Sequence, residues 1–331
     1  MIKTINYVIT SETNPYKNLA MEEYLLRQVK DDEVILYLWQ NEKTVVIGKN
    51  QNPWKECKLA ELAEDGGRLV RRLSGGGAVF HDLGNLNFTF LATKENYDVE
   101  RQLEVILKAV RQLGIPAEKS GRNDITVESR KFSGNAFFFD GKHCYHHGTI
   151  LVGVDMSMLS NYLNVLREKL VSKGVESVRA RVANLKEYVP ELTIDCMRKE
   201  LVKAYEEVYG LAPVELPWSM LQQDELRTLE EKFASWEWNL GKRMEFNYSI
   251  DKRFAWGNMD LEFVVDAGRI NLCKAYSDAL ETDYCDKLSA ALSGCIFSSS
   301  AILTALNEMP LTSEEAGMHR DVVSLIQEIK L

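Results

Sequence analysis

The sequence predicts an α+β protein with two domains, and three observations support this. Strand-like and helical segments follow one another irregularly before Trp238, which favours a mixed β-sheet with packed helices over a regular βαβ repeat. The chain has 331 residues, 45% of them hydrophobic, which is enough for two domains with buried cores. After Trp238, short alternating segments precede a helical stretch. We therefore expect a large domain, 1–246, and a small α+β domain, 250–331.

In the large domain, segments rich in Val, Ile and aromatic residues predict strands at 34–39 and 44–48. From Asp98, apolar residues recur at spacings of three and four, which predicts a helix that ends at Gly114. Further strands are expected at 124–128, 131–139 and 148–154, and further helices near 156–166 and 195–209.

The small domain is expected to begin with short strands, since polar and apolar residues alternate over much of 244–279. Two or three helices should follow, the last covering about 317–330. An α+β unit of this size can fold by itself.

The composition disfavours several classes of protein. The longest apolar run, 34–39, is too short to span a bilayer, and the first residues lack the apolar core of a signal peptide. The six cysteines form no Cys-x-x-Cys pair, which fits reduced thiols better than a disulfide framework or a zinc site. The net charge of −9 disfavours binding to nucleic acid or an anionic membrane. We expect a cytoplasmic monomer that binds neither.

One segment departs from this acidic balance. Between 166 and 187, six basic residues stand against three acidic ones. Such a segment can bind a single anionic ligand, although by composition alone a solvated helix face is the commoner explanation.

A run of three glycines marks the sharpest candidate site. In RLVRRLSGGGAVFHD (68–82), a strand-like segment carrying Arg71 and Arg72 leads into the glycines at 75–77, and a second strand-like segment follows. Consecutive glycines leave backbone N–H groups open to an anion, and an adjacent arginine adds bidentate donors. Because neighbouring strand residues alternate in direction, only one of the two arginines can face such a ligand. The alternative is a flexible hairpin turn between surface arginines. No Walker A motif occurs, so a P-loop fold is not expected.

Two charged residues lie near a second glycine-led turn. Asp124 follows this polar turn and precedes a strand, which is a suitable place for a carboxylate that binds Mg²⁺. Lys131 enters an apolar strand. A lysine in that position commonly extends its ammonium to the surface, but it can instead neutralise an anionic centre.

The segment CYHHGTILV (144–152) places two histidines side by side on an expected strand. His146 and His147 should then face opposite sides of the sheet, where they cannot easily share a metal ion. With five histidines and no cysteines at ligand spacing, a zinc site is not expected. Cys144 beside them suggests a Cys–His nucleophile, against the commoner alternative of an unreactive cysteine.

Taken together, these segments resemble the lipoate–protein ligase A family. The similarity lies in the order and spacing of many segments and extends over nearly the whole chain. The resemblance implies a catalytic domain on a mixed β-sheet of the biotin and lipoate protein ligase type, with a small α+β accessory domain at the C-terminus. The matching stretches are NLAMEEYL (18–25), TVVIGKNQNPWKEC (44–57), RRLSGGGAVFHDLGNLNFTF (71–90), GRNDI (121–125), RKFSGNA (130–136), HHGTILV (146–152), SVRARVANL (177–185) and ASWEWNLG (234–241).

The resemblance also implies two half-reactions. Lipoate and ATP, with Mg²⁺, give lipoyl-AMP and pyrophosphate, and the lipoyl group then passes to a lysine of an acceptor protein. The implied acceptors are the lipoyl domains of 2-oxoacid dehydrogenase complexes and the H protein of glycine cleavage. The segment at about 163–181 resembles the adenylate-binding loop that rearranges between the half-reactions, which favours anion binding by the basic segment.

Residues that match the family's motifs are expected to have corresponding roles. Lys131 resembles the lysine that contacts both the lipoate carboxyl and the α-phosphate, and it is the expected catalytic residue. Asp124 is the expected Mg²⁺ contact. The expected ATP-binding residues are Arg72, Gly77, Ala78, Val79, Phe80 and Lys131. The expected lipoate-binding residues are Lys131, Arg72, Ser74, Gly75, Gly76, His81, His147 and Gly148.

Two other functions are compatible with the same fold. An octanoyl or lipoyl transferase would use a cysteine acyl-enzyme instead of ATP, and Cys144 is the cysteine next to the motifs. The intact GGGAVFHD segment, Lys131 and the accessory domain favour the ligase over this transferase. A non-catalytic lipoate-binding protein is the third class, and the presence of Lys131, Arg72 and Asp124 argues against it.

Overall fold

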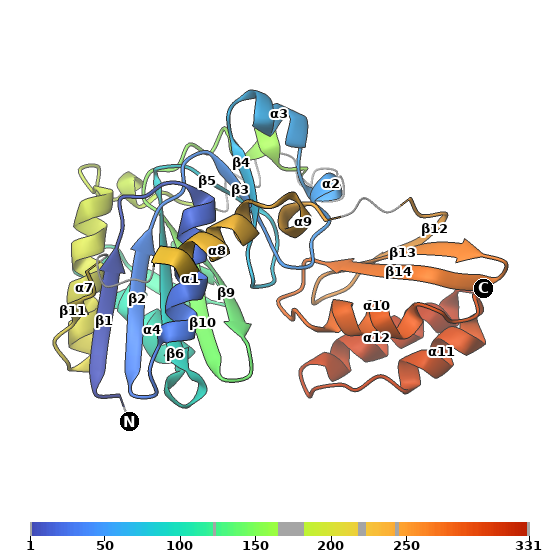
Figure 1. Ribbon diagram of the computed structural model, residues 1–331. Coiled ribbons are helices and arrows are strands. Elements are labelled where there is room, and N and C mark those ends of the chain that lie inside the picture. The colour runs from blue at the N-terminus through green and yellow to red at the C-terminus, as the bar shows by residue number, and fades with distance from the viewer. Residues whose placement is uncertain (1, 122–123, 165–181, 218–222, 242–244, 330–331) are drawn as a thin grey trace. The chain divides into compact units, whose positions relative to one another are not determined.

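The chain forms two compact units (Figure 1). The computed structural model describes residues 2–121, 124–164, 182–217, 223–241 and 245–329. Unit 1 comprises Met1–Val46, Glu56–Arg71 and Val79–Asn239, and unit 2 comprises Ile47–Lys55, Arg72–Ala78 and Leu240–Leu331. The long segment of unit 2 begins slightly before the boundary expected at 246–250. The glycine run at 75–77 therefore folds with the C-terminal part of the chain, which continuity of sequence does not indicate.

Unit 1 is built on a mixed sheet of eight strands in the order β11-β1-β2-β6-β10-β9-β8-β7. β1 runs parallel to both β2 and β11, and the other neighbours are antiparallel. The strands are β1 (Thr4–Ile9), β2 (Glu33–Trp39), β6 (Asn85–Thr93), β7 (Ala117–Ser120), β8 (Asp124–Val127), β9 (Arg130–Phe139), β10 (His143–Leu151) and β11 (Val214–Glu215).

Helices cover both faces of this sheet (Figure 1). α4 (Val99–Gln112) and α7 (Ile194–Tyr209) pack on one face, against alternate apolar residues of β2 and β6, and form the main core. On the other face lies α1 (Pro15–Gln28), with α8 (Gln223–Ala234) packed beside it. The remaining helical segments are α3 (Leu59–Glu64), α5 (Leu159–Tyr162), α9 (Trp236–Asn239) and the short 3₁₀ turns at Lys94–Asn96 and Leu185–Glu187.

The two strands that flank the glycine run do not pair with each other. β4 (Arg68–Arg71) and β5 (Val79–His81) lie on either side of β3 (Thr44–Ile47) in a small sheet of order β4-β3-β5. The alternative of a hairpin turn at 75–77 is therefore wrong, because a third strand separates the two ends of the run.

Unit 2 contains an antiparallel sheet of β12 (Tyr248–Arg253), β13 (Asn258–Asp266) and β14 (Arg269–Ser277). Leu261 and Phe263 of β13 are completely buried in one core with residues of three following helices. These helices are α10 (Tyr284–Leu292), α11 (Ser299–Asn307) and α12 (Glu315–Glu328). The short helix α2 (Pro53–Glu56) lies where the chain leaves unit 2 for unit 1. In the described part of the chain, no helix is long and apolar enough to cross a membrane.

Most expected elements are present, with two corrections. The strand expected at 148–154 instead covers His143–Leu151, since the Asp140 side chain accepts hydrogen bonds from the backbone N–H groups of Lys142 and His143 and turns the chain into β10. The helix expected near 156–166 is only the four-residue α5, among the residues described there, and 165–166 lie outside them.

His146 lies on the α4 face and should make stability sensitive to acid. Its ring is fully buried, with Nδ1 3.2 Å from Gln102 Oε1 and Nε2 2.8 Å from Asn135 Oδ1. Burial lowers the pKa of His146 from 6.5 to about 3. Between these two values the unfolded chain binds a proton that the folded chain does not, so the free energy of unfolding should fall as the pH decreases through this window.

Replacing this histidine tests the expectation. His146→Gln keeps a polar side chain but cannot take up the proton, so its free energy of unfolding should depend less steeply on pH. Urea unfolding measured across the window gives both slopes. Equal slopes for the two proteins would show that His146 does not contribute.

Candidate active site

Lys131 and Asp124 form an ion pair at one side of the polar face of the unit 1 sheet. Lys131 Nζ lies 2.7 Å from Asp124 Oδ1, and the two side chains are 39% and 37% exposed. The ammonium is therefore paired and not simply extended into solvent. A Cβ atom on Gly134 would lie 2.8 Å from the same Nζ, so the lysine side chain passes directly over this glycine.

A row of residues leads from this ion pair across the sheet. Register places Asp124 of β8 opposite Gly134 of β9, and Asn87 of β6 between Thr149 of β10 and Trp39 of β2. Gly134 N donates to Thr149 Oγ1 at 3.3 Å, and this hydrogen bond connects the first pair of residues to the other three. Cross-strand partners share one face of a sheet, so these five residues, here called the polar row, lie on the side that carries α1.

Beside the polar row, a buried glutamate connects α1 to the sheet. Glu22 Oε1 accepts a hydrogen bond from Thr89 Oγ1 at 2.7 Å and lies 2.8 Å from His147 Nδ1. Trp39 Nε1 donates to Thr89 Oγ1 at 3.1 Å. His147 Nδ1 is therefore the ring nitrogen that contacts the carboxylate of Glu22. Glu22 was not predicted as a site residue, although two adjacent acids among the apolar residues of NLAMEEYL were a signal.

The histidine of β5 belongs to the same region of unit 1. His81 is buried, and its ring meets the Trp39 indole edge-on with centroids 6.5 Å apart. Its Nδ1 lies 3.4 Å from Asn41 Nδ2. Phe80 points elsewhere, with its ring 5.2 Å from that of Tyr162.

The two histidines of β10 do face opposite sides, as expected from their adjacency. His147 lies on the α1 face, whereas His146 lies among the aromatic residues of the α4 face. Gly148 shares the side of His146: a Cβ atom there would lie 2.6 Å from Phe88 Cζ and 2.7 Å from Asn135 Oδ1. Its absent side chain thus allows tight packing of the core beside the site.

The glycine run is held within unit 2 by Arg72. The guanidinium is 6% exposed and donates to Ser74 Oγ at 3.0 Å and to the carbonyl groups of Gly75 and Gly77 at 2.7 Å and 2.9 Å. Gly76 N donates to Ala279 O at 2.9 Å. The arginine therefore shapes the loop by binding its carbonyl groups.

Its neighbour Arg71 turns the other way, as the alternation of strand residues predicts. Within unit 1, the Arg71 guanidinium donates to the backbone carbonyl groups of Trp238 and Asn239. Arg71 is thus fully engaged in the structure of unit 1, and Arg72 is the arginine that meets the glycine run.

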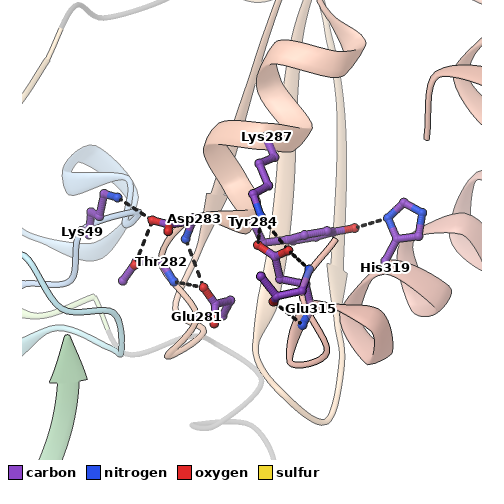
Figure 2. A network of polar contacts seen from close by, with 9 residues as sticks. Lys49, Glu281, Thr282, Asp283, Tyr284, Lys287, Glu315 and His319 are labelled. Atoms are coloured by element: carbon purple, nitrogen blue, oxygen red, sulfur yellow. Dashed lines mark hydrogen bonds and ion pairs between the residues drawn. The ribbon is translucent and has the colours of Figure 1, made fainter. Parts of the chain in front are cut away.

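The GKNQ segment after β3 is also bound to the C-terminal part of unit 2. Lys49 Nζ donates to Asp283 Oδ1 at 3.2 Å, as Figure 2 shows, and Asn50 Nδ2 donates to Thr282 O at 2.6 Å. Asn50 O accepts from Ser277 N at 3.0 Å. Two motif segments of the N-terminal half therefore depend on the residues before α10 for their position.

The residues described offer a limited set of metal ligands. Among them, no group of three or more His, Cys, Asp or Glu side chains is arranged to hold a metal ion. Asp124 is a single, partly exposed carboxylate next to Lys131. This suits Mg²⁺, which typically takes one or two protein carboxylates and completes its shell with water and substrate phosphates.

The segment expected to bind the adenylate, 163–181, lies almost wholly outside the described residues, since only 163 and 164 are among them. The chain that follows it returns next to the lysine. Ala183 N donates to Lys131 O at 2.9 Å, and Val182 forms a parallel bridge with Lys131.

Cys144 has the properties of a structural cysteine. It is 3% exposed and lies opposite Ala92, on the α4 face of the sheet. Burial raises the pKa of its thiol to about 11, so the thiolate that a nucleophile requires is scarce at neutral pH.

Cys144→Ser should therefore keep most of the activity of the protein. Activity assays at matched protein concentration would check this, with thermal unfolding to detect loss of the folded form. A thioester trapped on Cys144 during turnover would contradict the expectation and favour the transferase.

Comparison with known proteins agrees with this fold. The profile described as "Lipoyl protein ligase A/B catalytic domain" matches residues 14–206, and that described as "Bacterial lipoate protein ligase C-terminus" matches residues 243–326. The Plasmodium falciparum protein LipL1, solved with lipoate, is 29% identical, with a TM-score of 0.85 over 98% of this chain and 100% of its own.

Two further structures match most of this chain and nearly all of their own. A bipartite lipoate protein ligase of Thermoplasma acidophilum, studied with its E2 lipoyl domain, is 29% identical, with a TM-score of 0.65 over 74% of this chain and 99% of its own. A lipoate-protein ligase A bound with ATP is 28% identical, with a TM-score of 0.62 over 73% and 99%. The first profile alone covers more than half of the chain, and the second covers the C-terminal part. The chain belongs to the lipoate–protein ligase family.

Proposed function

We propose that this protein activates lipoate with ATP and transfers the lipoyl group to a lysine of an acceptor protein. The observation that carries the proposal is the ammonium of Lys131, which is partly exposed and pairs with Asp124 at one end of the polar row. Solved relatives with bound lipoate and with bound ATP support the choice of substrates.

In the first half-reaction, a carboxylate oxygen of lipoate attacks the α-phosphorus of ATP. A new oxygen–phosphorus bond forms, the bond from the α-phosphorus to the bridging oxygen breaks, and pyrophosphate leaves. Two anions must approach each other, so catalysis depends on positioning and charge neutralisation more than on proton transfer. Lys131 is the compact cation suited to contact both the carboxylate and the α-phosphate.

The glycine run is proposed to contact the nucleotide through its backbone and not through charged side chains. We propose that Arg72 and the segment from Ser74 to Phe80 bind ATP and the carboxyl end of lipoate, with backbone N–H groups as donors to phosphate oxygens. Asp124 would hold Mg²⁺, which when bound supplies further neutralisation of the phosphates. Asp124 must then exchange its contact with Lys131 for one with the metal ion.

His81 and His147 are proposed to contact the lipoyl group, because both lie beside the polar row. The ring of His81 contacts Trp39 of the row, and His147 contacts Glu22, which is linked to Trp39 through Thr89. Gly148 is proposed to act indirectly, because its lack of a side chain allows β10, which carries His147, to pack closely against Phe88 and Asn135. In the second half-reaction the amine nitrogen of the acceptor lysine attacks the acyl carbon of lipoyl-AMP. An amide bond forms, the bond from that carbon to the phosphate oxygen breaks, AMP leaves, and the nitrogen loses a proton to solvent. The acceptors we propose are lipoyl domains, as in the archaeal relative, and the glycine cleavage H protein, all in the cytoplasm.

A transferase that uses a cysteine is less well supported. The cysteine next to the motifs, Cys144, is buried on the face opposite His147, and its thiol pKa is raised. The side chain that pairs with Asp124 at the end of the polar row is Lys131 and not a cysteine.

The test is attachment of lipoate to a purified apo lipoyl domain, followed by intact mass spectrometry. The domain should gain one lipoyl group only when ATP, Mg²⁺ and the enzyme are all present, and a domain with its acceptor lysine changed to arginine should gain none. Attachment from a thioester donor without ATP would instead establish the transferase.

A further inference from the structure

Asn87 is a buried residue of the polar row to which the proposed chemistry gives no role. Its side chain is 2% exposed, and its Nδ2 makes no hydrogen bond within the described structure. Asn87 Oδ1 accepts from Asn85 Nδ2 at 2.9 Å, and in this arrangement the Nδ2 of Asn87 is left facing away from that bond. A buried N–H donor that lacks a partner is costly, and such groups are rare in folded proteins.

The Asn87 N–H lies at a distance from Lys131 that the acyl chain of a bound acid could cover. Neighbouring strands lie about 4.8 Å apart, so Asn87 is roughly 10 Å from Gly134, over which Lys131 extends. An extended medium-chain acid with its carboxylate at Lys131 is long enough to cover this distance along the row. Its tail then reaches Asn87 and the indole of Trp39.

The chemistry at this end of the row favours sulfur over a plain hydrocarbon. An all-carbon tail would bury the Asn87 N–H without an acceptor, whereas a dithiolane sulfur is a weak acceptor for it. Sulfur also makes favourable contacts with aromatic rings, and the Trp39 indole lies opposite Asn87 in the sheet.

We propose that Asn87 determines the specificity for the acyl tail: its side-chain N–H donates to a dithiolane sulfur and so favours lipoate over octanoate. The proposal rests on the proposed function, since it assumes that the carboxylate binds at Lys131. It concerns the far end of the substrate, where no bond is made or broken.

The experiment compares three acids in ATP–pyrophosphate exchange: lipoate, octanoate, and an analogue of lipoate with a cyclopentane ring in place of the dithiolane. The analogue retains the bulk of the ring without the sulfur atoms. The wild-type protein should have a higher kcat/KM for lipoate than for either other acid. In Asn87→Leu, the ratio of lipoate to the cyclopentane analogue should fall about three- to tenfold, mainly through a higher KM for lipoate.

Two further variants keep the result interpretable. Asn87→Ala removes the same donor without added bulk, so it should show the same loss of ratio if Asn87→Leu does not fold. Asn135→Leu is the matched control, because Asn135 is also a buried asparagine of this sheet but contacts His146 on the opposite face. It should alter stability and leave the ratio unchanged.

Several outcomes would overturn the proposal. A wild-type protein with no preference for lipoate over the cyclopentane analogue would do so. Equal loss of activity with all three acids in the Asn87 variants would also overturn the proposal. It would indicate that Asn87 has a structural role, or that its side-chain N–H donates to a buried water molecule. If no acid supports exchange in the wild-type protein, the proposed function itself fails, and this inference fails with it.

Discussion

Lys131→Ala is expected to slow the formation of lipoyl-AMP by about 10²–10³-fold, the usual cost of removing one preorganised donor from an active site. Transfer from supplied lipoyl-AMP should be slowed as well, because the proposed contact spans both the carboxyl and the phosphate. The fold should survive, since the partner that remains, Asp124, is partly exposed and can be solvated. Single-turnover assays of each half-reaction, together with thermal unfolding, measure these effects.

The variant Lys131→Arg tests whether a positive charge at this position is sufficient for activity or whether the compact shape of the ammonium is also required. It keeps the positive charge but replaces a compact ammonium with a wider planar group, and it should also lose most of the activity. Lys119→Ala is a matched control, because Lys119 is similarly exposed and forms its own ion pair, with Glu100. If Lys131→Ala and Lys131→Arg both form lipoyl-AMP at near wild-type rates, Lys131 is only a paired surface residue.

Gly75→Ala is expected to displace the glycine run and weaken the binding of ATP. A Cβ atom at Gly75 would lie 2.3 Å from Ala279 O and 2.5 Å from Leu280 O. Both are backbone atoms, so neither can move as a side chain could. Overpacking of this kind typically costs about 1–3 kcal/mol, and the loop must shift to relieve it. We expect a lower midpoint of urea unfolding and a raised KM for ATP.

Gly77→Ala provides the comparison within the same run. A Cβ atom at Gly77 would meet nothing within 4 Å, so its effect on the free energy of unfolding should stay within about 0.5 kcal/mol. A stable Gly75→Ala variant with unchanged KM for ATP would show that contact with the chain before α10 does not position the loop.

The features that sequence analysis predicted best are those set by local pattern. The stripe of apolar residues after Asp98 predicted α4, which the structure shows from Val99 to Gln112 with Asp98 as its N-cap. Alternation along strands predicted that His146 and His147 face opposite sides, and that Arg71 and Arg72 have different partners. Each of these depends only on residues close in sequence.

The helix α1 shows why some of the site was missed. Ten of its residues are buried, among them Glu22 and Glu23, so no single apolar stripe marks it in the sequence. The role of Glu22 depends on contacts with Thr89 and His147, which are distant in sequence. Helical periodicity cannot indicate a helix that is buried on most sides.

Long-range pairing also decided which residues lie together. The glycine run folds as part of unit 2, in which the backbone N–H of Gly76 donates to the carbonyl of Ala279, a residue far away in the chain. The polar row likewise depends on the registers of five strands, and Asn87 carries no sequence signal as part of a site. Neither composition nor local spacing contains this information.

The proposed function depends on one step, in which lipoate is joined to AMP with release of pyrophosphate. Exchange of labelled pyrophosphate into ATP, with no acceptor protein present, measures that step in isolation. We expect exchange that requires lipoate and Mg²⁺, is retained in Cys144→Ser and is lost in Lys131→Ala. Absence of lipoate-dependent exchange in the folded wild-type protein, under conditions where a thioester on Cys144 is detected, would show that the protein is not an ATP-dependent ligase.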